Sequence, residues 1–100
     1  MFHADIKKSI VLMLARELGR EGPSVMSELV PCRVIGDAEQ RYQNDPQQKN
    51  VYCLNKWCQI NGSQATLDKL KKVLENNDRN DLVHEVDRID AREQGYETAP

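Results

Sequence analysis

The sequence predicts an all-α fold, a compact antiparallel bundle of six short helices in residues 1–90, followed by a flexible C-terminal tail in residues 91–100. Three observations support this prediction. Apolar residues recur with the helical period of 3.6 in several segments, and no segment alternates convincingly as a half-buried strand would. Capping or breaking residues bound most of these segments. The predicted connections are only two to six residues long, which favours helices packed as antiparallel neighbours.

The first three helices are expected before residue 43. The first covers residues 4–18 and ends at Gly19, and its apolar positions are Ile6, Ile10, Val11, Leu14 and Leu18. Ser24 can cap a short second helix that ends before Pro31. The third helix follows Pro31 and runs to about Tyr42, with one buried edge formed by Val34, Ile35 and Ala38.

The last three helices have clearer start signals. Asp45 can accept backbone N–H bonds and Pro46 suits the first helical position, so the fourth helix begins there and ends near residue 60, before Gly62. We expect Ser63 to cap the fifth helix and Asp78 to cap the sixth. Their apolar stripes are Val51, Leu54, Trp57 and Cys58 in the fourth, Ala65, Leu67, Leu70, Val73 and Leu74 in the fifth, and Leu82, Val83, Val86 and Ile89 in the sixth.

The composition describes one small globular domain. The 100 residues are 39% hydrophobic and 30% charged, with a net charge of −2. A charge so near zero does not attract nucleic acid or membranes in bulk, so any electrostatic partner must be recognised by local patches. No apolar run approaches the roughly 20 residues that span a bilayer. Three cysteines without a CxxC pair favour a reducing compartment, and we expect a cytoplasmic protein.

The only tryptophan is predicted to join two helices. Trp57 lies near the end of the fourth helix, and Ala65 leaves room for its ring at the start of the fifth, where Thr66 can help satisfy backbone groups. We therefore predict a core that contains Leu14, Leu18, Leu54, Trp57, Ala65, Leu70, Leu74, Leu82 and Val86.

These residues also carry a resemblance to a known family. Trp57, the Asn61-Gly62 turn, the Ala65-Thr66 pair, the Leu67, Leu70 and Leu74 stripe and the closing segment Asn80–Val83 resemble the corresponding features of death domains. The resemblance covers residues 41–89. It is weaker upstream, where the segment Pro23–Met26 stands in place of the family's usual second tryptophan. It implies a death-domain-like bundle that acts as an adaptor in apoptotic or innate immune signalling, without enzymatic activity.

The same resemblance implies the partners and the surfaces that bind them. Death domains assemble with one another through surfaces of opposite charge, so the expected partners are other death-domain proteins, whether receptors, adaptors or kinases, and further copies of this chain. The acidic surface would contain Asp37 and Glu39 with Arg41 beside them. The second surface would contain Lys69, Lys72, Arg79 and Asp81.

The residues themselves favour neither catalysis nor a metal or cofactor site. His3 lies near the terminus and no cysteine is spaced to lie beside His84, so both histidines are interpreted as structural or surface residues. Cys53 and Cys58 are five residues apart on one helix, which splays their side chains, and core filling explains them better than zinc binding. We therefore expect no catalytic, metal-binding or cofactor-binding residue.

Two other classes of interaction module remain as alternatives. Residues 59–74 form two helical segments joined by a glycine turn, which also describes a DNA-binding helix-turn-helix. A recognition helix should, however, belong to a basic domain, and this chain is slightly acidic. A caspase-recruitment or death-effector domain would bind its partners in a similar way, but those partners would differ. The spacing from Trp57 to Ala65 favours the death-domain branch.

Overall fold

The structure, a computed structural model, describes residues 6–93. Within that range the chain forms α-helices and short 3₁₀-helices and contains no strand, so the predicted all-α fold class is confirmed. The elements are α1 (Lys8–Leu18), η1 (Gly19–Glu21), α2 (Gly22–Met26), α3 (Cys32–Arg41), α4 (Pro46–Asn61), η2 (Gly62–Gln64), α5 (Leu67–Asn76) and α6 (Asn80–Glu93). Because α2 has only five residues, the five longer helices supply most of the packing surface.

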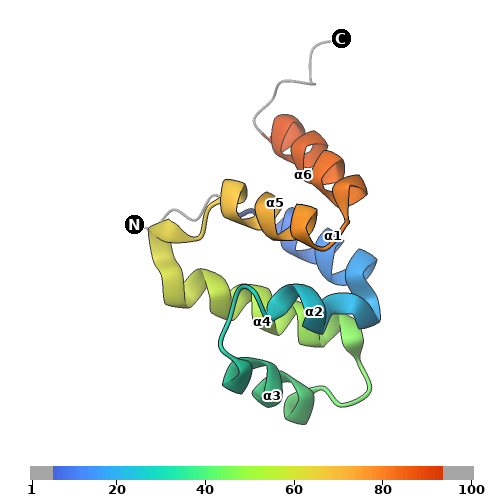
Figure 1. The fold of residues 1–100 in the computed structure, drawn as a ribbon, viewed down its shortest axis with the longest axis vertical. Helices are drawn as coiled ribbons and strands as arrows, with labels where there is room; N and C mark the ends of the chain where they lie inside the picture. Colours follow the sequence, from blue (N-terminus) through green and yellow to red (C-terminus); the bar gives the residue numbers. More distant parts are fainter. Residues whose placement is uncertain (1–5, 94–100) are drawn as a thin grey trace.

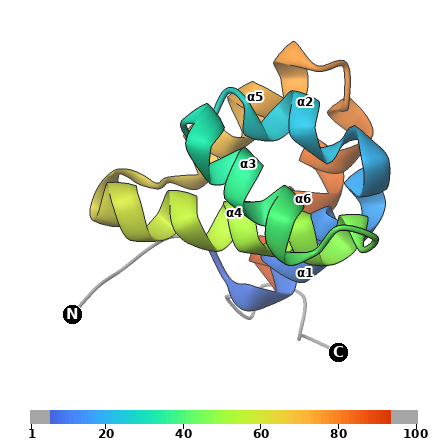
Figure 2. The same ribbon diagram turned by 90° about the horizontal axis from the view of Figure 1, so that it is seen from below.

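The helix α4 is the centre of the fold. It packs against α1, α2 and α3, while α6 packs against α1 and α5. In Figure 1 the helix α3 lies below α4 and α5 lies above it, with α6 at the far end of the long axis. Figure 2, seen from below, shows α3 in front of α4 and α6 behind it. The helices α3 and α6 therefore lie at opposite ends of the molecule. None of the helices in residues 6–93 is both long enough and apolar enough to cross a membrane.

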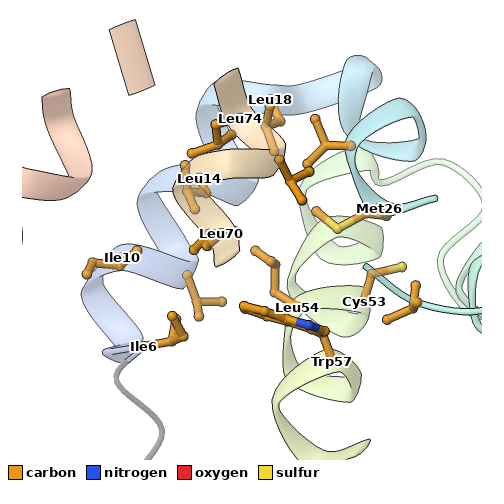
Figure 3. Packing of buried hydrophobic residues seen from close by; sticks show 14 of the residues in the cluster. Ile6, Ile10, Leu14, Leu18, Met26, Cys53, Leu54, Trp57, Leu70 and Leu74 are labelled. Carbon is orange, nitrogen blue, oxygen red and sulfur yellow. The ribbon is translucent and has the colours of Figure 1, made fainter. Parts of the chain in front are cut away.

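The core contains the Trp57 side chain, which is 3% exposed. Figure 3 shows its indole pointing from α4 toward Ile6 and Leu70, beside Leu54. Ala65 is fully buried in the segment that precedes α5. All nine residues of the predicted core are buried in the structure: Leu14, Leu18, Leu54, Trp57, Ala65, Leu70, Leu74, Leu82 and Val86.

Several predicted helix boundaries are found in the structure. The helix α1 ends at Gly19, whose φ of 49° is easy for glycine and costly for other residues. Asp45 caps α4, because its side chain accepts a hydrogen bond of 3.0 Å from the Gln48 N–H. Gly62, with a φ of 53°, ends α4 in the same way as Gly19 ends α1.

The beginnings of the first two helices differ from the prediction. The helix α1 begins at Lys8, because Lys7 before it has an extended backbone; residues 1–5 lie outside the described range. The helix α2 begins at Gly22 and not at a Ser24 cap, which is already inside the helix. The reason is Pro23: a proline has no N–H, and the N–H groups of the first turn need no partner within the helix.

The cap of α5 is Thr66, so the prediction of a Ser63 cap was wrong. Residues 62–64 continue from α4 as the 3₁₀ turn η2, and this turn includes Ser63. The Thr66 side chain instead accepts a hydrogen bond of 3.3 Å from the Lys69 N–H. Ala65 and Thr66 therefore precede the fifth helix and do not form its first turn.

The prediction that Asp78 caps the sixth helix was also wrong, because Asp78 completes the end of α5. Its φ is 61°, and its N–H donates to the carbonyl of Glu75 at 3.0 Å. The Arg79 N–H donates to the carbonyl of Leu74 at 2.9 Å. This pair of bonds is the Schellman arrangement, which satisfies carbonyls at a helix end. At its own end, α6 continues to Glu93, so residues 91–93 are helical, and residues 94–100 of the predicted tail lie outside the described range.

Candidate protein-interaction surfaces

The first predicted surface is built from α3 and α4, and Tyr52 is at its centre. The Tyr52 hydroxyl donates a hydrogen bond to the Asp37 carboxylate. Arg41, one helical turn after Asp37, donates to the same carboxylate at 3.2 Å. The Arg41 guanidinium lies 5.3 Å from the centre of the Tyr52 ring, and the Lys56 amine lies 5.5 Å from it. Cations at this distance are attracted to an aromatic ring.

These contacts set the charge state of the surface. The hydrogen bond from Tyr52, and then the bond and charge of Arg41, hold the pKa of Asp37 below its ordinary value of 3.8. The bond to Asp37 in turn raises the pKa of Tyr52 above 10.0. Glu39, the other predicted acid, pairs with Lys49 of α4 at 2.9 Å. Both predicted acids therefore already have cationic partners within the molecule.

A groove runs between α3 and α4 beside Tyr52. Its volume is about 670 Å³, and its lining combines cationic, polar and apolar side chains. We call it the α3–α4 groove. It is lined by Arg33, Val34, Gly36, Asp37, Gln40, Tyr52, Lys56, Gln59 and Ile60.

The second predicted surface is centred on Arg79, at the turn between α5 and α6. Its guanidinium donates to Glu21 of η1 at 2.7 Å and to both carboxylate oxygens of Asp81 at 3.1 Å. The Arg79 side chain is 21% exposed, whereas those of Glu21 and Asp81 are 67% and 64% exposed. The arginine therefore lies beneath its two acids, and the turn presents carboxylates to the solvent.

The two lysines predicted for this surface lie on α5. Lys69 and Lys72 are both exposed. Lys71 between them instead pairs with Asp87 of α6 at 2.8 Å, and this hydrogen bond raises the pKa of Lys71. The structure thus divides the α5 lysines into one that joins two helices and two that face solvent.

Comparison with known families supplies the identification. The family model of the death domain matches residues 10–89, which is most of the chain. The chain belongs to the death domain family. No curated protein and no solved structure matches it. Death domains are protein–protein interaction modules of signalling proteins, so the match supports a role in binding other death-domain proteins. It favours that class over the helix-turn-helix alternative.

The sequence analysis missed one polar residue that supports this death domain from within. Asn50 of α4 is 2% exposed, and its Nδ2 donates to the carbonyls of Ala15 at 3.1 Å and Gly19 at 2.9 Å. These carbonyls lie where α1 passes into η1, and each also accepts a backbone N–H, from Gly19 at Ala15 and from Gly22 at Gly19. A Cβ at Gly22 would lie 1.7 Å from the Asn50 Oδ1, so the close approach of these two residues needs a glycine.

A second missed group of residues fixes the end of α5 on α2. Asn77 donates to the Glu28 carboxylate at 2.8 Å and to the carbonyl of Val73 at 2.8 Å. Ser24 in turn donates to the Asn77 side chain at 3.4 Å. The sequence signals Asn77 only as a helix breaker, because Glu28 and Ser24 are about 50 residues away along the chain.

Cys53 and Cys58 on α4 are at least partly buried, whereas Cys32 at the start of α3 is exposed. Burial, and then the charge of Glu39, raises the pKa of the Cys53 thiol to about 11, and burial also raises the pKa of Cys58. His84 is exposed on α6, and His3 lies outside the described residues. Residues 6–93 contain no cluster of three or more His, Cys, Asp or Glu side chains that could hold a metal ion.

Proposed function

We propose that this death domain is an adaptor module that assembles an apoptotic or innate immune signalling complex in the cytoplasm. The observation that carries the proposal is the death domain match over residues 10–89. Its partners would be death-domain receptors, adaptors or kinases, together with further copies of the chain. Bringing effector proteins together on such a complex raises their effective concentration, which is sufficient to activate enzymes that work in pairs.

A finer likeness supports the choice of an apoptotic or immune adaptor. The spacings from Arg41 to Trp57 and from Trp57 to Ala65 resemble those in the death domain of the Fas-associated adaptor. We propose that this chain serves a comparable linking role as a divergent member of the family.

We propose two binding surfaces on different sides of the domain. One contains Asp37, Glu39 and Arg41 on α3, and the other contains Lys69, Lys72, Arg79 and Asp81 around α5 and the start of α6. Internal ion pairs hold the charged side chains of the first surface, and Arg79 with Asp81 of the second, in defined positions, while Lys69 and Lys72 face solvent. Charged side chains at the rim of an interface mainly steer association and select the partner.

The proposal is tested by capture of death domains. Immobilised wild-type protein is incubated with purified death domains from receptors, adaptors and kinases, and we expect at least one to bind. Asp37→Lys and Arg79→Glu should each weaken that binding, because each reverses a charge at one of the proposed surfaces. Lys8→Glu, an exposed position of α1 outside both surfaces, is the control.

Circular dichroism must first show that every variant is folded. Failure of the wild type to bind any death domain would contradict the proposed function. Unchanged binding by a folded Asp37→Lys or Arg79→Glu variant would remove that residue from the proposed surfaces.

A further inference from the structure

A second hollow adjoins the α3–α4 groove at Tyr52. Its volume is about 460 Å³, and it shares Tyr52, Lys56 and Gln59 with the groove. We call it the Tyr42 hollow; its other lining residues are Arg41, Tyr42, Gln48, Val51 and Asn55. Both hollows lie within the range of about 300–1,000 Å³ that small-molecule sites occupy. The surface beside α4 therefore offers room for a ligand of that size.

Two tyrosine rings meet at the Tyr42 hollow. Tyr42 lies in the short connection from α3 to α4 (Figure 1), and Tyr52 lies on α4. Their ring centres are 6.1 Å apart, and the ring planes are inclined by 57°. Both side chains are only partly buried. A partly exposed aromatic ring can stack on a nucleobase, because every base has an aromatic face.

The same two hollows contain cations that lack an acidic partner. Arg33 is exposed at the start of α3, and the Lys56 amine lies over the Tyr52 ring. Neither cation forms an ion pair with a described residue. Asp37, the one acid in either lining, already accepts hydrogen bonds from Arg41 and Tyr52. The linings therefore carry two positive charges that an anionic ligand can neutralise.

Four amide side chains border the two hollows. All four are exposed, and their side chains form no hydrogen bond with the described residues. An amide presents both a donor and an acceptor, which is the combination that the edges of nucleobases require. These residues are Gln40, Gln48, Asn55 and Gln59.

We propose that the α3–α4 groove and the Tyr42 hollow together form a binding site for a free nucleoside diphosphate. The base would stack on the Tyr42 ring and bond to the amides, and the diphosphate would lie between Arg33 and Lys56. This inference goes beyond the proposed function and does not depend on it. The sequence predicted no such site, because the residues of α3 and α4 come together only in the folded chain.

The combination of groups selects this class of ligand. An inorganic anion would use the two cations and leave the rings and amides without a partner. A nucleic-acid strand needs a row of cations along its backbone, whereas the two unpaired cations of these linings suit the phosphates of one nucleotide.

The test is isothermal titration calorimetry of the wild-type chain with ADP, adenosine, inorganic diphosphate and a short single-stranded oligoadenylate. Arg33→Gln with Lys56→Gln removes the two unpaired cations, and Tyr42→Leu removes the stacking ring. Arg20→Gln with Lys72→Gln, at exposed positions outside both hollows, is the control matched in net charge. Arg33→Gln alone replaces the double variant if circular dichroism shows that the latter does not fold.

We expect ADP to bind at least about tenfold more tightly than adenosine or inorganic diphosphate, because only ADP uses the rings and the cations together. The variant without the two cations should bind ADP at least about tenfold more weakly, while the control binds it like the wild type. Tyr42→Leu should weaken the binding of ADP and leave that of inorganic diphosphate unchanged, which a general loss of structure would not do.

Four results would overturn the inference. The first is a wild type that does not bind ADP, and the second is equal affinity for ADP and inorganic diphosphate, which would indicate an adventitious ion only. The third is a folded variant without the cations that binds ADP like the control. The fourth is oligoadenylate binding more than about tenfold tighter than ADP, which would assign the surface to a nucleic-acid strand. The capture of other death domains is a separate measurement, so the proposed function stands or fails independently.

Discussion

At the residue scale, Asn50 and Gly22 form a joint between α4 and the end of α1. The Asn50 amide donates to the carbonyls of Ala15 and Gly19, and its position allows no side chain at residue 22. A buried polar side chain is tolerated when its hydrogen bonds are made, and removing the Asn50 amide loses both of these bonds across the α1–α4 contact. The joint therefore fixes how α1 enters η1 and α2.

This joint predicts a specific coupling between two substitutions. Gly22→Ala should lower the free energy of unfolding by about 1–3 kcal/mol, since its Cβ overlaps the Asn50 side chain. Asn50→Ala should lower it by about 1–3 kcal/mol through the loss of its two hydrogen bonds. In urea titrations the double variant should lose less than the sum of the two, because Asn50→Ala removes the clash.

Asn55→Ala, at an exposed position of the same helix, is the control and should change the free energy of unfolding by less than about 0.5 kcal/mol. Strict additivity in the double variant would show that Gly22 and Asn50 do not share the contact described above.

At the element scale, the helix boundaries show what the sequence could and could not predict. The Asp45 cap and the glycine stops at Gly19 and Gly62 were predictable, because each acts through its own few residues. Ser63 and Asp78 were misassigned although each is a good capping residue. A 3₁₀ turn after α4 includes Ser63, and Asp78 takes the left-handed backbone that ends α5. Residue type alone does not show which of two nearby residues, each able to cap a helix, will do so in the folded chain.

The corrected cap leads to a prediction for α5. Thr66→Ala should lower the free energy of unfolding by about 1 kcal/mol, because the Lys69 N–H loses its acceptor at the start of the helix. Ser63→Ala, three residues earlier, should change it by less than about 0.5 kcal/mol. Urea unfolding followed by circular dichroism measures both, and a larger loss for Ser63→Ala than for Thr66→Ala would restore the original assignment.

At the scale of the whole molecule, long-range pairing changes what the charged residues do. The sequence indicated which residues are charged, but Tyr52 is 15 residues from Asp37 and Glu21 is 58 residues from Arg79. Only the packing of α3 on α4, and of η1 beside the start of α6, brings these groups together. The sequence therefore identified candidate residues of the two surfaces but not their internal partners or their net charge.

The paired carboxylates predict how stability depends on pH. The pKa values of Asp37 and Asp81 lie below their ordinary value of 3.8 in the folded chain, because Tyr52 and Arg41 stabilise the first carboxylate and Arg79 the second. Their contribution is therefore complete above about pH 5 and is lost as the pH falls below 3.8 through the lowered values. Asp37→Asn should reduce the loss of stability between pH 7 and pH 3.

Urea unfolding at several pH values measures this effect, with Glu75→Gln at an exposed position of α5 for comparison. If a folded Asp37→Asn variant loses as much stability between pH 7 and pH 3 as the wild type does, the role given to the Asp37 pairs is contradicted.

The three free cysteines differ in a way that experiments can use. Cys32 is exposed at the first position of α3, next to Arg33, while Cys53 is buried and Cys58 is partly buried, both with raised pKa values. Since the thiolate is the form that reacts, a maleimide dye near neutral pH should label Cys32 first. The natural sequence thus provides an attachment point for a fluorophore on α3, the helix of the first proposed surface, where energy transfer to a second labelled molecule would follow association as it occurs.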